Sequence, residues 1–409
     1  MNVEPVSPQK PRVVIIRGDW LSRRDTQYYE SLSDRYDLLG VSVRRTVHDL
    51  SLVTFPVVTP WSPDSLLAKL PPLQFAVDRA LRLRSENLMY FWGLGRICRG
   101  ASVIDVAETF HPFCLQAVRI RQKGGVRLVV RAHENIPFAH HNLAYRRYVK
   151  SQVFRWADAF ITCSELGRHS LEMEGAPLDK IRVIPVGTDV QHFSPAGRDE
   201  RLMADFGLTA EHFVVLFAGR IVWEKGVFDV LNAACLLRSG LPQLRVIVVG
   251  EGPELSKLRR EVAARDLSDV VRVAGKAPVT SMPAYYSVAD VVVVPSIATP
   301  KWQEQFGGVV IEAMACGKAL VASDSGAIPE VVGDAGIIVP QANYLSLAEA
   351  IFELYNDPAL GVKLGKKARH RAVRNFSNEI VADQIRSLYH SLGVTGLAVP
   401  RPEEGLQNG

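Results

Sequence analysis

Short apolar runs alternate with amphipathic stretches along the first half of the chain. The first run, at residues 11–16, ends at Gly18 and Asp19, and residues 142–156 form an amphipathic stretch. Strands and helices that alternate at this spacing are typical of a parallel, doubly wound sheet. The other elements predicted in this half are strands at residues 102–106, 127–130, 159–163 and 181–184 and a helix at residues 66–83.

A second alternating series follows residues 186–199, a stretch with Gly, Ser and Pro and no periodicity that has the composition of a linker. The strands of this series are apolar without alternation, as expected where helices cover both faces of a parallel sheet. The predicted strands lie at residues 213–218, 244–249, 270–273, 291–294, 319–322 and 337–339, and helices lie at residues 227–238 and 378–392.

The two series predict an α/β fold with two doubly wound domains. Residues 1–189 form the first domain and residues 190–376 the second, followed by a last helix at residues 377–393. The polar tail at residues 394–409 is predicted to be disordered. A length of 409 residues also favours two domains over one. Ligands of such a pair of domains are expected between the carboxyl ends of their strands.

Composition adds an expectation about location and partners. The five cysteines have no close pair, which argues against a disulfide framework or a zinc site and favours a reducing compartment. Without a signal peptide or an apolar run near the ~20 residues that span a bilayer, the expected location is cytoplasmic. Residues 1–189 carry 26 Lys and Arg against 19 Asp and Glu. This excess suits an anionic acceptor or peripheral contact with a membrane, and equally an ordinary solvated surface.

The segment at residues 295–330 carries the clearest chemistry. Glu304 follows an apolar strand, Gly307 and Gly308 open a helix, and Glu312 lies within that helix. The free amides of Phe306, Gly307 and Gly308, with the helix dipole behind them, suit a diphosphate, and a carboxylate further along suits the diol of a ribose. Two exposed carboxylates would be the simpler interpretation, but a pair embedded in strand, loop, Gly-Gly and helix favours a binding site.

A second segment, residues 217–226, places Arg220 and Lys225 after the first strand of the second domain. Both cations would lie at the carboxyl edge of the sheet, beside a helix amino terminus. A guanidinium binds phosphate as a fork and an ammonium binds it as a point charge. Two basic residues after a strand are more often a solvated surface, yet their position on the same edge as Gly307 and Gly308 favours phosphate binding.

Together these segments resemble the glycosyl transferases "group 1" family (family 4), retaining enzymes with the GT-B fold of two Rossmann-like domains. The resemblance runs from about residue 217 to residue 340 and rests on GRIVWEKG, VVGEGPEL, Gly275–Lys276, EQFGGVVIEAMACGKALVAS and SGAIPEVVGDAGIIVP, with a looser match in the first domain. It includes a pair of glutamates, Glu304 and Glu312, separated by seven residues.

The resemblance implies a role for each candidate residue. Arg220 and Lys225 are expected to bind the diphosphate of a nucleotide-sugar donor. The resemblance places Glu312 on the ribose, and Glu304 and His133 near the transferred sugar. It further implies that the reaction retains the anomeric configuration, with a UDP- or GDP-sugar as donor and a glycan, a glycolipid or another hydroxyl compound as acceptor. The biological setting that it implies is surface-polysaccharide or glycoconjugate assembly. It also implies that the last helix crosses back to the first domain. The backbone of Phe306, Gly307 and Gly308 is expected to assist at the sugar or phosphate.

The first domain departs from the family in one feature. Many relatives have two glycines after the first strand, beside the phosphates and the acceptor, whereas this chain has Gly18 alone. The acceptor side is therefore less defined by the sequence than the donor side. A non-catalytic nucleotide-sugar-binding subunit and a sugar-nucleotide epimerase of the same fold are the alternatives.

The sequence lacks the motifs expected for a dinucleotide cofactor, a metal site or nucleic-acid binding. The chain has no complete G-x-G-x-x-G fingerprint and no Asp-x-Asp triplet, so neither a dinucleotide cofactor nor an essential metal is expected. His140 and His141 are adjacent and point apart, which does not suit a metal site. The basic residues are not interleaved with aromatic ones along one segment, so nucleic acid is not an expected partner.

Overall fold

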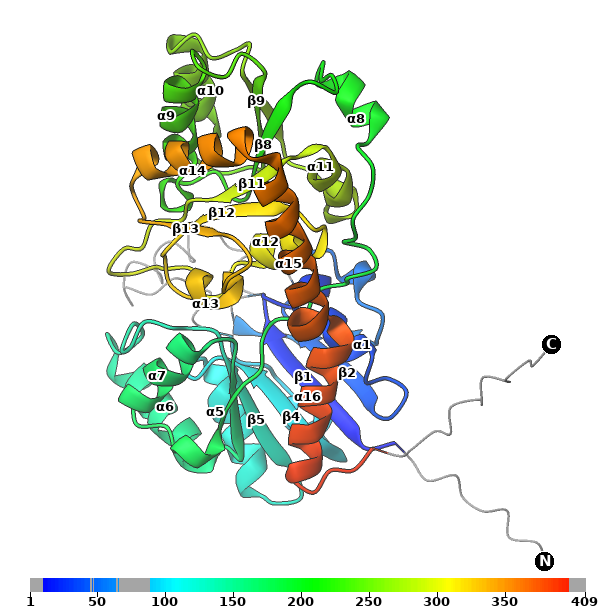
Figure 1. Ribbon diagram of the computed structural model, residues 1–409. Coiled ribbons are helices and arrows are strands. Elements are labelled where there is room, and N and C mark those ends of the chain that lie inside the picture. The colour runs from blue at the N-terminus through cyan, green and yellow to red at the C-terminus, as the bar shows by residue number, and fades with distance from the viewer. Residues whose placement is uncertain (1–9, 45, 47, 64, 66–88, 397–409) are drawn as a thin grey trace, which may run out of the picture.

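The computed structural model describes residues 10–44, 46, 48–63, 65 and 89–396. The described residues form two α/β domains, each built on one parallel sheet with helices on both sides, and the two lie one above the other in Figure 1. The helix predicted at residues 66–83 and most of the predicted tail, residues 397–409, lie outside the described residues.

The amino-terminal domain has a seven-stranded parallel sheet with strand order β3-β2-β1-β4-β5-β6-β7. Neighbouring strands pair in parallel throughout, and β1 lies between β2 and β4. The strands are β1 (Arg12–Gly18), β2 (Asp37–Ser42), β3 (Val57–Val58), β4 (Ala101–Ala107), β5 (Arg127–Ala132), β6 (Ala159–Thr162) and β7 (Ile181–Val183).

The carboxyl-terminal domain has a six-stranded parallel sheet with strand order β10-β9-β8-β11-β12-β13. In both sheets the strand order reverses beside the first strand, β1 or β8, so each sheet has a switch point at its carboxyl edge. The strands are β8 (Phe213–Ala218), β9 (Leu244–Val249), β10 (Val271–Gly275), β11 (Val291–Val294), β12 (Ala319–Ser323) and β13 (Ile337–Val339).

Apolar side chains on both faces of each strand explain why helices cover both sides of the sheets. In β1, Val14 and Ile16 belong to one buried cluster, whereas Val13 and Ile15 belong to another on the opposite face. All four are completely buried. Strands of this kind are stable only between two helical layers, because burial of their apolar surface drives the packing.

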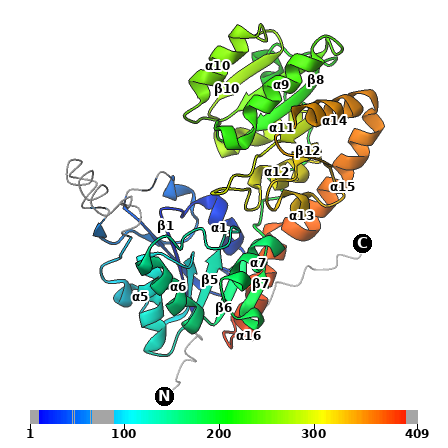
Figure 2. The ribbon, with the colours of Figure 1, turned by 90° about the vertical axis from the view of Figure 1, so that its left-hand side faces the viewer.

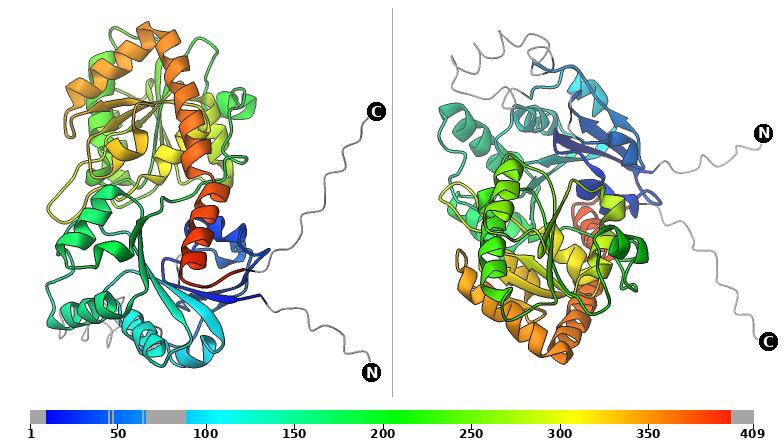
Figure 3. Two further views of the ribbon diagram at one scale, coloured as in Figure 1. Left: turned by 60° about the horizontal axis from the view of Figure 1, so that its bottom comes forward. Right: turned by 90° about the horizontal axis from the view of Figure 1, so that it is seen from above.

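The helices vary from a single turn to about five turns. Figure 3 shows α14 and α15 in the carboxyl-terminal domain and α16 continuing into the amino-terminal domain. The α-helices are α1 (Arg23–Glu30), α4 (Leu94–Ile97), α5 (Pro112–Gln122), α6 (Ala144–Trp156), α7 (Glu165–Met173), α8 (Glu200–Asp205), α9 (Val227–Leu237), α10 (Leu255–Ala264), α11 (Met282–Val288), α12 (Gly308–Ala315), α13 (Ile328–Val332), α14 (Tyr344–Asn356), α15 (Pro358–Phe376) and α16 (Asn378–Ser391). Short 3-10 turns lie at Leu50–Leu52, Leu178–Lys180, Trp223–Lys225 and Val279–Ser281.

Two chain segments connect the domains side by side. Thr188, in the first crossing, forms a parallel bridge with Ser377, in the second. The amide of Thr188 donates to the carbonyl of Phe376 at 2.7 Å, and the amide of Asn378 donates to the carbonyl of Thr188 at 3.1 Å. Beyond this bridge α16 packs Val381 and Ile385 onto the face of the amino-terminal sheet that carries Val13.

Candidate active site

The candidate site is formed by the segments that follow β5, β8 and β11, at the junction of the two domains, whose arrangement Figure 2 shows. Contacts cross this junction directly. The side-chain amide of Asn135, after β5, donates to the carbonyl of Glu304 at 2.9 Å. Gln303 donates back to the carbonyl of Asn135 at 3.1 Å. The loop that carries Glu304 is therefore held by both domains.

Glu304 lies in the loop between β11 and α12 and is 8% exposed. Lys225 Nζ donates to Glu304 Oε2 at 2.6 Å, and Ser296 Oγ donates to the same oxygen at 2.9 Å. Among the described residues no hydrogen bond engages Oε1. One oxygen is thus fixed by the protein, and the other remains to accept a hydrogen bond from a ligand.

The two predicted cations differ in their surroundings. Lys225 ends a 3-10 turn after β8, where Glu304 and the ring of Trp302, 4.8 Å from Nζ, hold its ammonium group. Arg220 is exposed, and no ion pair of its side chain is found within the described part of the chain. A fixed ammonium group and an unpaired guanidinium after the same strand suit an anionic ligand.

The amino end of α12 has the helix-start geometry that we expected from Gly307 and Gly308. Gly307 adopts a left-handed conformation with φ of 86° and caps the helix, so a side chain at this position would be strained. Phe306 packs its ring edge-on against Phe376 in the core, so only its backbone can face the cleft. No hydrogen bond from the amides of residues 306–308 is found among the described residues, which leaves three donors at a helix amino terminus.

Glu312 lies one turn into α12 and is 4% exposed. Tyr286 Oη donates to Glu312 Oε2 at 2.9 Å, and Arg24 pairs with Oε1. The carboxylate that the resemblance assigns to a ribose is therefore paired with a cation, Arg24, which belongs to the other domain.

Arg24 was not predicted as a site residue. It lies in the first turn of α1, and a methyl group added to Gly308 would lie 3.2 Å from the guanidinium carbon of Arg24. Ser22 caps this helix by accepting from the amide of Asp25. A serine with an acidic residue three positions later, directly after a strand, is a helix-start signal in the sequence.

His133 follows β5 and lies between two carboxylates. Its amide and its Nδ1 approach Glu108 Oε1 at 3.1 and 3.2 Å, and its Nε2 lies 3.7 Å from Asp25. Burial opposes ionisation of Glu108, but the hydrogen bonds and charge of His133 outweigh burial and lower the pKa of that carboxyl. Glu108 also has φ of 63°, an unfavourable value for a side chain of its size. This pair fixes the orientation of the imidazole.

Two family descriptions match the chain. Residues 199–371 match glycosyl transferases group 1, and residues 45–192 match glycosyltransferase family 4. Residues 199–371 belong to the glycosyl transferases group 1 family, and residues 45–192 to glycosyltransferase family 4. The family predicted from the sequence is thus confirmed, and it is a family of transferases.

The names of curated relatives state different substrates or products. D-inositol 3-phosphate glycosyltransferase of Pseudarthrobacter chlorophenolicus is 35% identical over 223 residues, which cover 53% of this chain and 51% of the relative. Alpha-D-kanosaminyltransferase of Streptomyces kanamyceticus is 26% identical over 303 residues, which cover 70% and 75%. Alpha-maltose-1-phosphate synthase of Mycobacterium tuberculosis is 32% identical over 252 residues, covering 58% and 64%. The match thus spans between about half and three quarters of these relatives.

Solved structures confirm the predicted GT-B fold. HepE of Anabaena, in complex with UDP, superimposes with a TM-score of 0.75 at 20% identity, covering 93% of this chain and 100% of that one. Sucrose-phosphate synthase of Thermosynechococcus elongatus gives 0.70 at 23% identity, covering 94% and 99%.

Gly18 lies at the end of β1, where the single glycine was noted. It has φ of 62°, and a methyl group there would lie 2.8 Å from the sulfur of Met89. The neighbouring Arg17 is completely buried and bonds to Asp105 Oδ1 at 2.9 Å and to Asp25 Oδ2 at 3.0 Å. The turn after β1 is thus close-packed and rests on buried charges.

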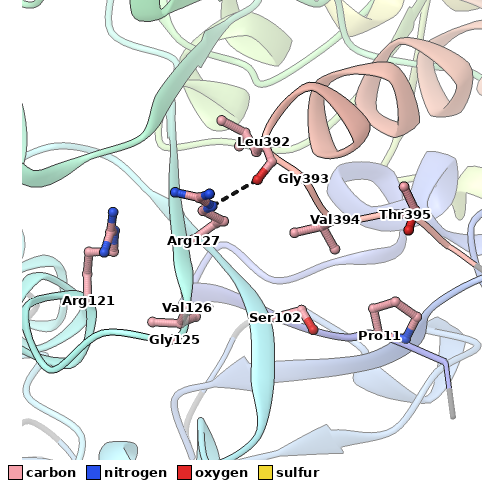
Figure 4. Close-up of a pocket in the computed structure, with 10 residues that line it drawn as sticks. All are labelled: Pro11, Ser102, Arg121, Gly125, Val126, Arg127, Leu392, Gly393, Val394 and Thr395. Atoms are coloured by element: carbon pink, nitrogen blue, oxygen red, sulfur yellow. Dashed lines mark hydrogen bonds between the residues drawn. The ribbon is translucent and has the colours of Figure 1, made fainter.

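A cavity of about 530 Å³ lies at the amino edge of the first sheet, away from the cleft. Figure 4 shows Arg127 beside the carbonyl of Leu392, to which its Nε donates at 2.8 Å. Arg127 and Arg121 both pair with Asp158, so the two cations beside this cavity share one carboxylate.

Two features are absent from the residues that the structure describes. No group of three or more His, Cys, Asp and Glu side chains is placed to hold a metal ion there. No helix in the same residues is both long and apolar enough to cross a membrane. Neither result tests the predicted metal independence or the predicted location, which stay predictions.

Proposed function

We propose that this chain is a retaining glycosyltransferase that moves a sugar from a nucleotide-sugar donor to a hydroxyl of a glycan, a glycolipid or another acceptor. The observation that carries this proposal is the convergence of Lys225, Glu304 and Glu312 with the free amides of α12 at the junction of the two domains. Cations, free amides and two carboxylates on one edge suit a diphosphate, a sugar and a ribose at once.

In the proposed reaction the bond between the anomeric carbon and the donor phosphate oxygen breaks. The acceptor oxygen bonds to the same face of that carbon, and its proton passes to the departing phosphate oxygen. Arg220, Lys225 and the amino end of α12 stabilise the charge that develops on the leaving diphosphate, since fixed dipoles need no reorganisation. Glu304 Oε1 and the imidazole of His133 contact the transferred sugar.

The finer assignments belong to the same proposal. UDP- and GDP-sugars are the proposed donors, and the reaction is proposed to need no metal. The proposed setting is surface-polysaccharide or glycoconjugate assembly in the cytoplasm, with peripheral contact between the basic amino-terminal domain and the membrane. The relatives' names support sugar transfer as the activity but name different products and acceptors.

A panel of nucleotide sugars tests the donor. Thermal unfolding of the purified chain is measured with UDP-, GDP- and ADP-sugars and the bare nucleotides, because a ligand at 100 times its Kd adds about 2.7 kcal/mol to folding stability. UDP-sugars come first, since a structure of the same fold contains UDP. Stabilisation by one nucleotide class is the expected result, and no response to any of them counts against the proposal.

Product analysis separates catalysis from binding. Nuclear magnetic resonance of the anomeric proton follows the preferred donor, with and without simple alcohols and sugars as acceptors. The expected product of transfer or slow hydrolysis keeps the donor's anomeric configuration. A donor that binds but is neither transferred nor hydrolysed would instead indicate the non-catalytic subunit, whose support is the single Gly18 on the acceptor side.

A further inference from the structure

α1 is held rigidly against the amino-terminal domain and the crossing segments. Asp25 pairs with Arg17 at 3.0 Å, and Gln27 donates to the carbonyl of Gly187, in the first crossing, at 3.0 Å. The side-chain amide of Asn378, at the start of α16, donates to Gln27 at 3.4 Å. The first turn of α1 therefore has a fixed place at the junction of the domains.

From this fixed helix Arg24 reaches into the other domain. Its guanidinium pairs with Glu312 and lies over Gly308, at the amino end of α12. The Arg24 side chain is 50% exposed, whereas that of Glu312 is buried, so the cation lies between the carboxylate and solvent. Arg24 thus contacts the carboxylate proposed for the ribose and lies beside Gly308, whose amide is one of the three free donors proposed for the phosphates.

We propose that Arg24 is a third cation of the donor site, supplied by the amino-terminal domain, which pairs with Glu312 in the ligand-free protein and passes to the donor diphosphate when the ribose takes Glu312. This inference rests on the proposed function. The exchange needs a short movement only, because the guanidinium already lies beside the amides that would hold the phosphates. Since Arg24 belongs to one domain and Glu312 to the other, a bound diphosphate replaces the ion pair as the link between them.

The exchange predicts opposite effects on two ligands. A nucleoside diphosphate breaks the ion pair with Glu312 but gains the guanidinium on its phosphates. A nucleoside breaks the same ion pair and gains nothing from Arg24. Removal of Arg24 should therefore weaken the diphosphate and leave the nucleoside unchanged or tighter. Bidentate, charge-assisted hydrogen bonds from a guanidinium to a phosphate contribute about ten- to a hundredfold in affinity.

Calorimetric titration tests this with UDP and uridine, or with GDP and guanosine or ADP and adenosine if the wild type prefers that base. Arg24→Ala should lower affinity for the diphosphate about tenfold or more and not lower affinity for the nucleoside. Arg24→Lys keeps the positive charge but loses the paired N–H donors of the guanidinium, so its affinity for the diphosphate should lie between those of the wild type and Arg24→Ala. Arg23→Ala is the matched control, because Arg23 faces Glu30 at 3.9 Å on α1 and should change neither affinity. Thermal unfolding without ligand checks that each variant is folded.

Two results would distinguish failure of the role proposed for Arg24 from failure of the proposed function. If Arg24→Ala bound the diphosphate as tightly as the wild type, or more tightly, Arg24 would only obstruct the ribose site and the inference would be wrong while the proposed function stood. If the wild type bound no nucleoside diphosphate of any base, the proposed function and the inference would both be wrong.

Discussion

Replacement of Asp105 by asparagine probes the buried charges beneath the candidate site. Asp105 lies on β4 with no exposed surface, and it accepts hydrogen bonds from Arg17 at 2.9 Å, Tyr29 at 2.6 Å and Tyr389 at 2.9 Å. Arg131, also buried, donates to the Tyr29 hydroxyl at 3.2 Å. The carboxylate therefore balances buried cations and, through Tyr389, ties α16 to the sheet.

An asparagine keeps the shape of Asp105 and removes its charge. Loss of one partner of a buried ion pair costs about 3–5 kcal/mol, because the cation that remains is buried and unpaired. We expect Asp105→Asn to lower the free energy of unfolding by about that amount at pH 7. Urea unfolding followed by circular dichroism measures this. The control is Asp34→Asn, which makes the same chemical change at an exposed pair with Arg35 and should cost less than about 0.5 kcal/mol.

The pH dependence of this penalty has a defined sign. Burial alone would raise the pKa of Asp105, but Arg17, then Arg131 and the tyrosine hydroxyls, outweigh burial and lower it. A carboxyl whose folded pKa is depressed stabilises the protein above its unfolded pKa, about 3.9 for aspartate, and loses that contribution as the pH falls through the folded pKa. The penalty should be equal at pH 7 and pH 5. A loss below 1 kcal/mol at pH 7, or one that differs between pH 7 and pH 5, would refute the reasoning.

Four further substitutions address the candidate site. Glu304→Gln should lower kcat more than donor affinity, whereas Arg220→Ala should weaken both, and steady-state kinetics with near-normal values for both variants would contradict the site assignment. Tyr286→Phe removes the hydroxyl that donates to Glu312 at 2.9 Å, and we expect about a tenfold loss of nucleoside affinity in calorimetric titration, since a hydrogen bond to a charged group contributes about 1.5–3 kcal/mol. Gly307→Ala forces a methyl group into a left-handed backbone 3.0 Å from Val310, so thermal unfolding should begin at lower temperature, and an unchanged midpoint would show that α12 tolerates the strain.

The strands of the second domain were largely predictable from the sequence. β8, β9, β11 and β13 begin and end at the predicted residues. Their runs are continuously apolar because both faces of the sheet are covered, and that pattern needs no knowledge of the partner strands.

Several elements of the first domain were not predicted, and α1 and β2 illustrate the physical reasons. α1 is a polar segment, RRDTQYYE, whose buried face is made of Tyr28, Tyr29 and Thr26 rather than aliphatic residues. β2 contains Gly40, whose lack of a side chain admits the close approach of Val57. In both cases neighbouring elements supply the packing, so the local sequence gives a weak signal.

The sequence by itself determined the family, most strands of the two sheets and the grouping of four candidate residues of the second domain, because one continuous segment supplies Glu304, Gly307, Gly308 and Glu312. Only the tertiary structure decided what meets them from the first domain. Arg24 lies 288 positions from Glu312, and Asn135 lies 169 positions from Glu304. Contacts over such separations arise from how two sheets face each other and how two crossing segments pair, and neither property is encoded in a local pattern of residues.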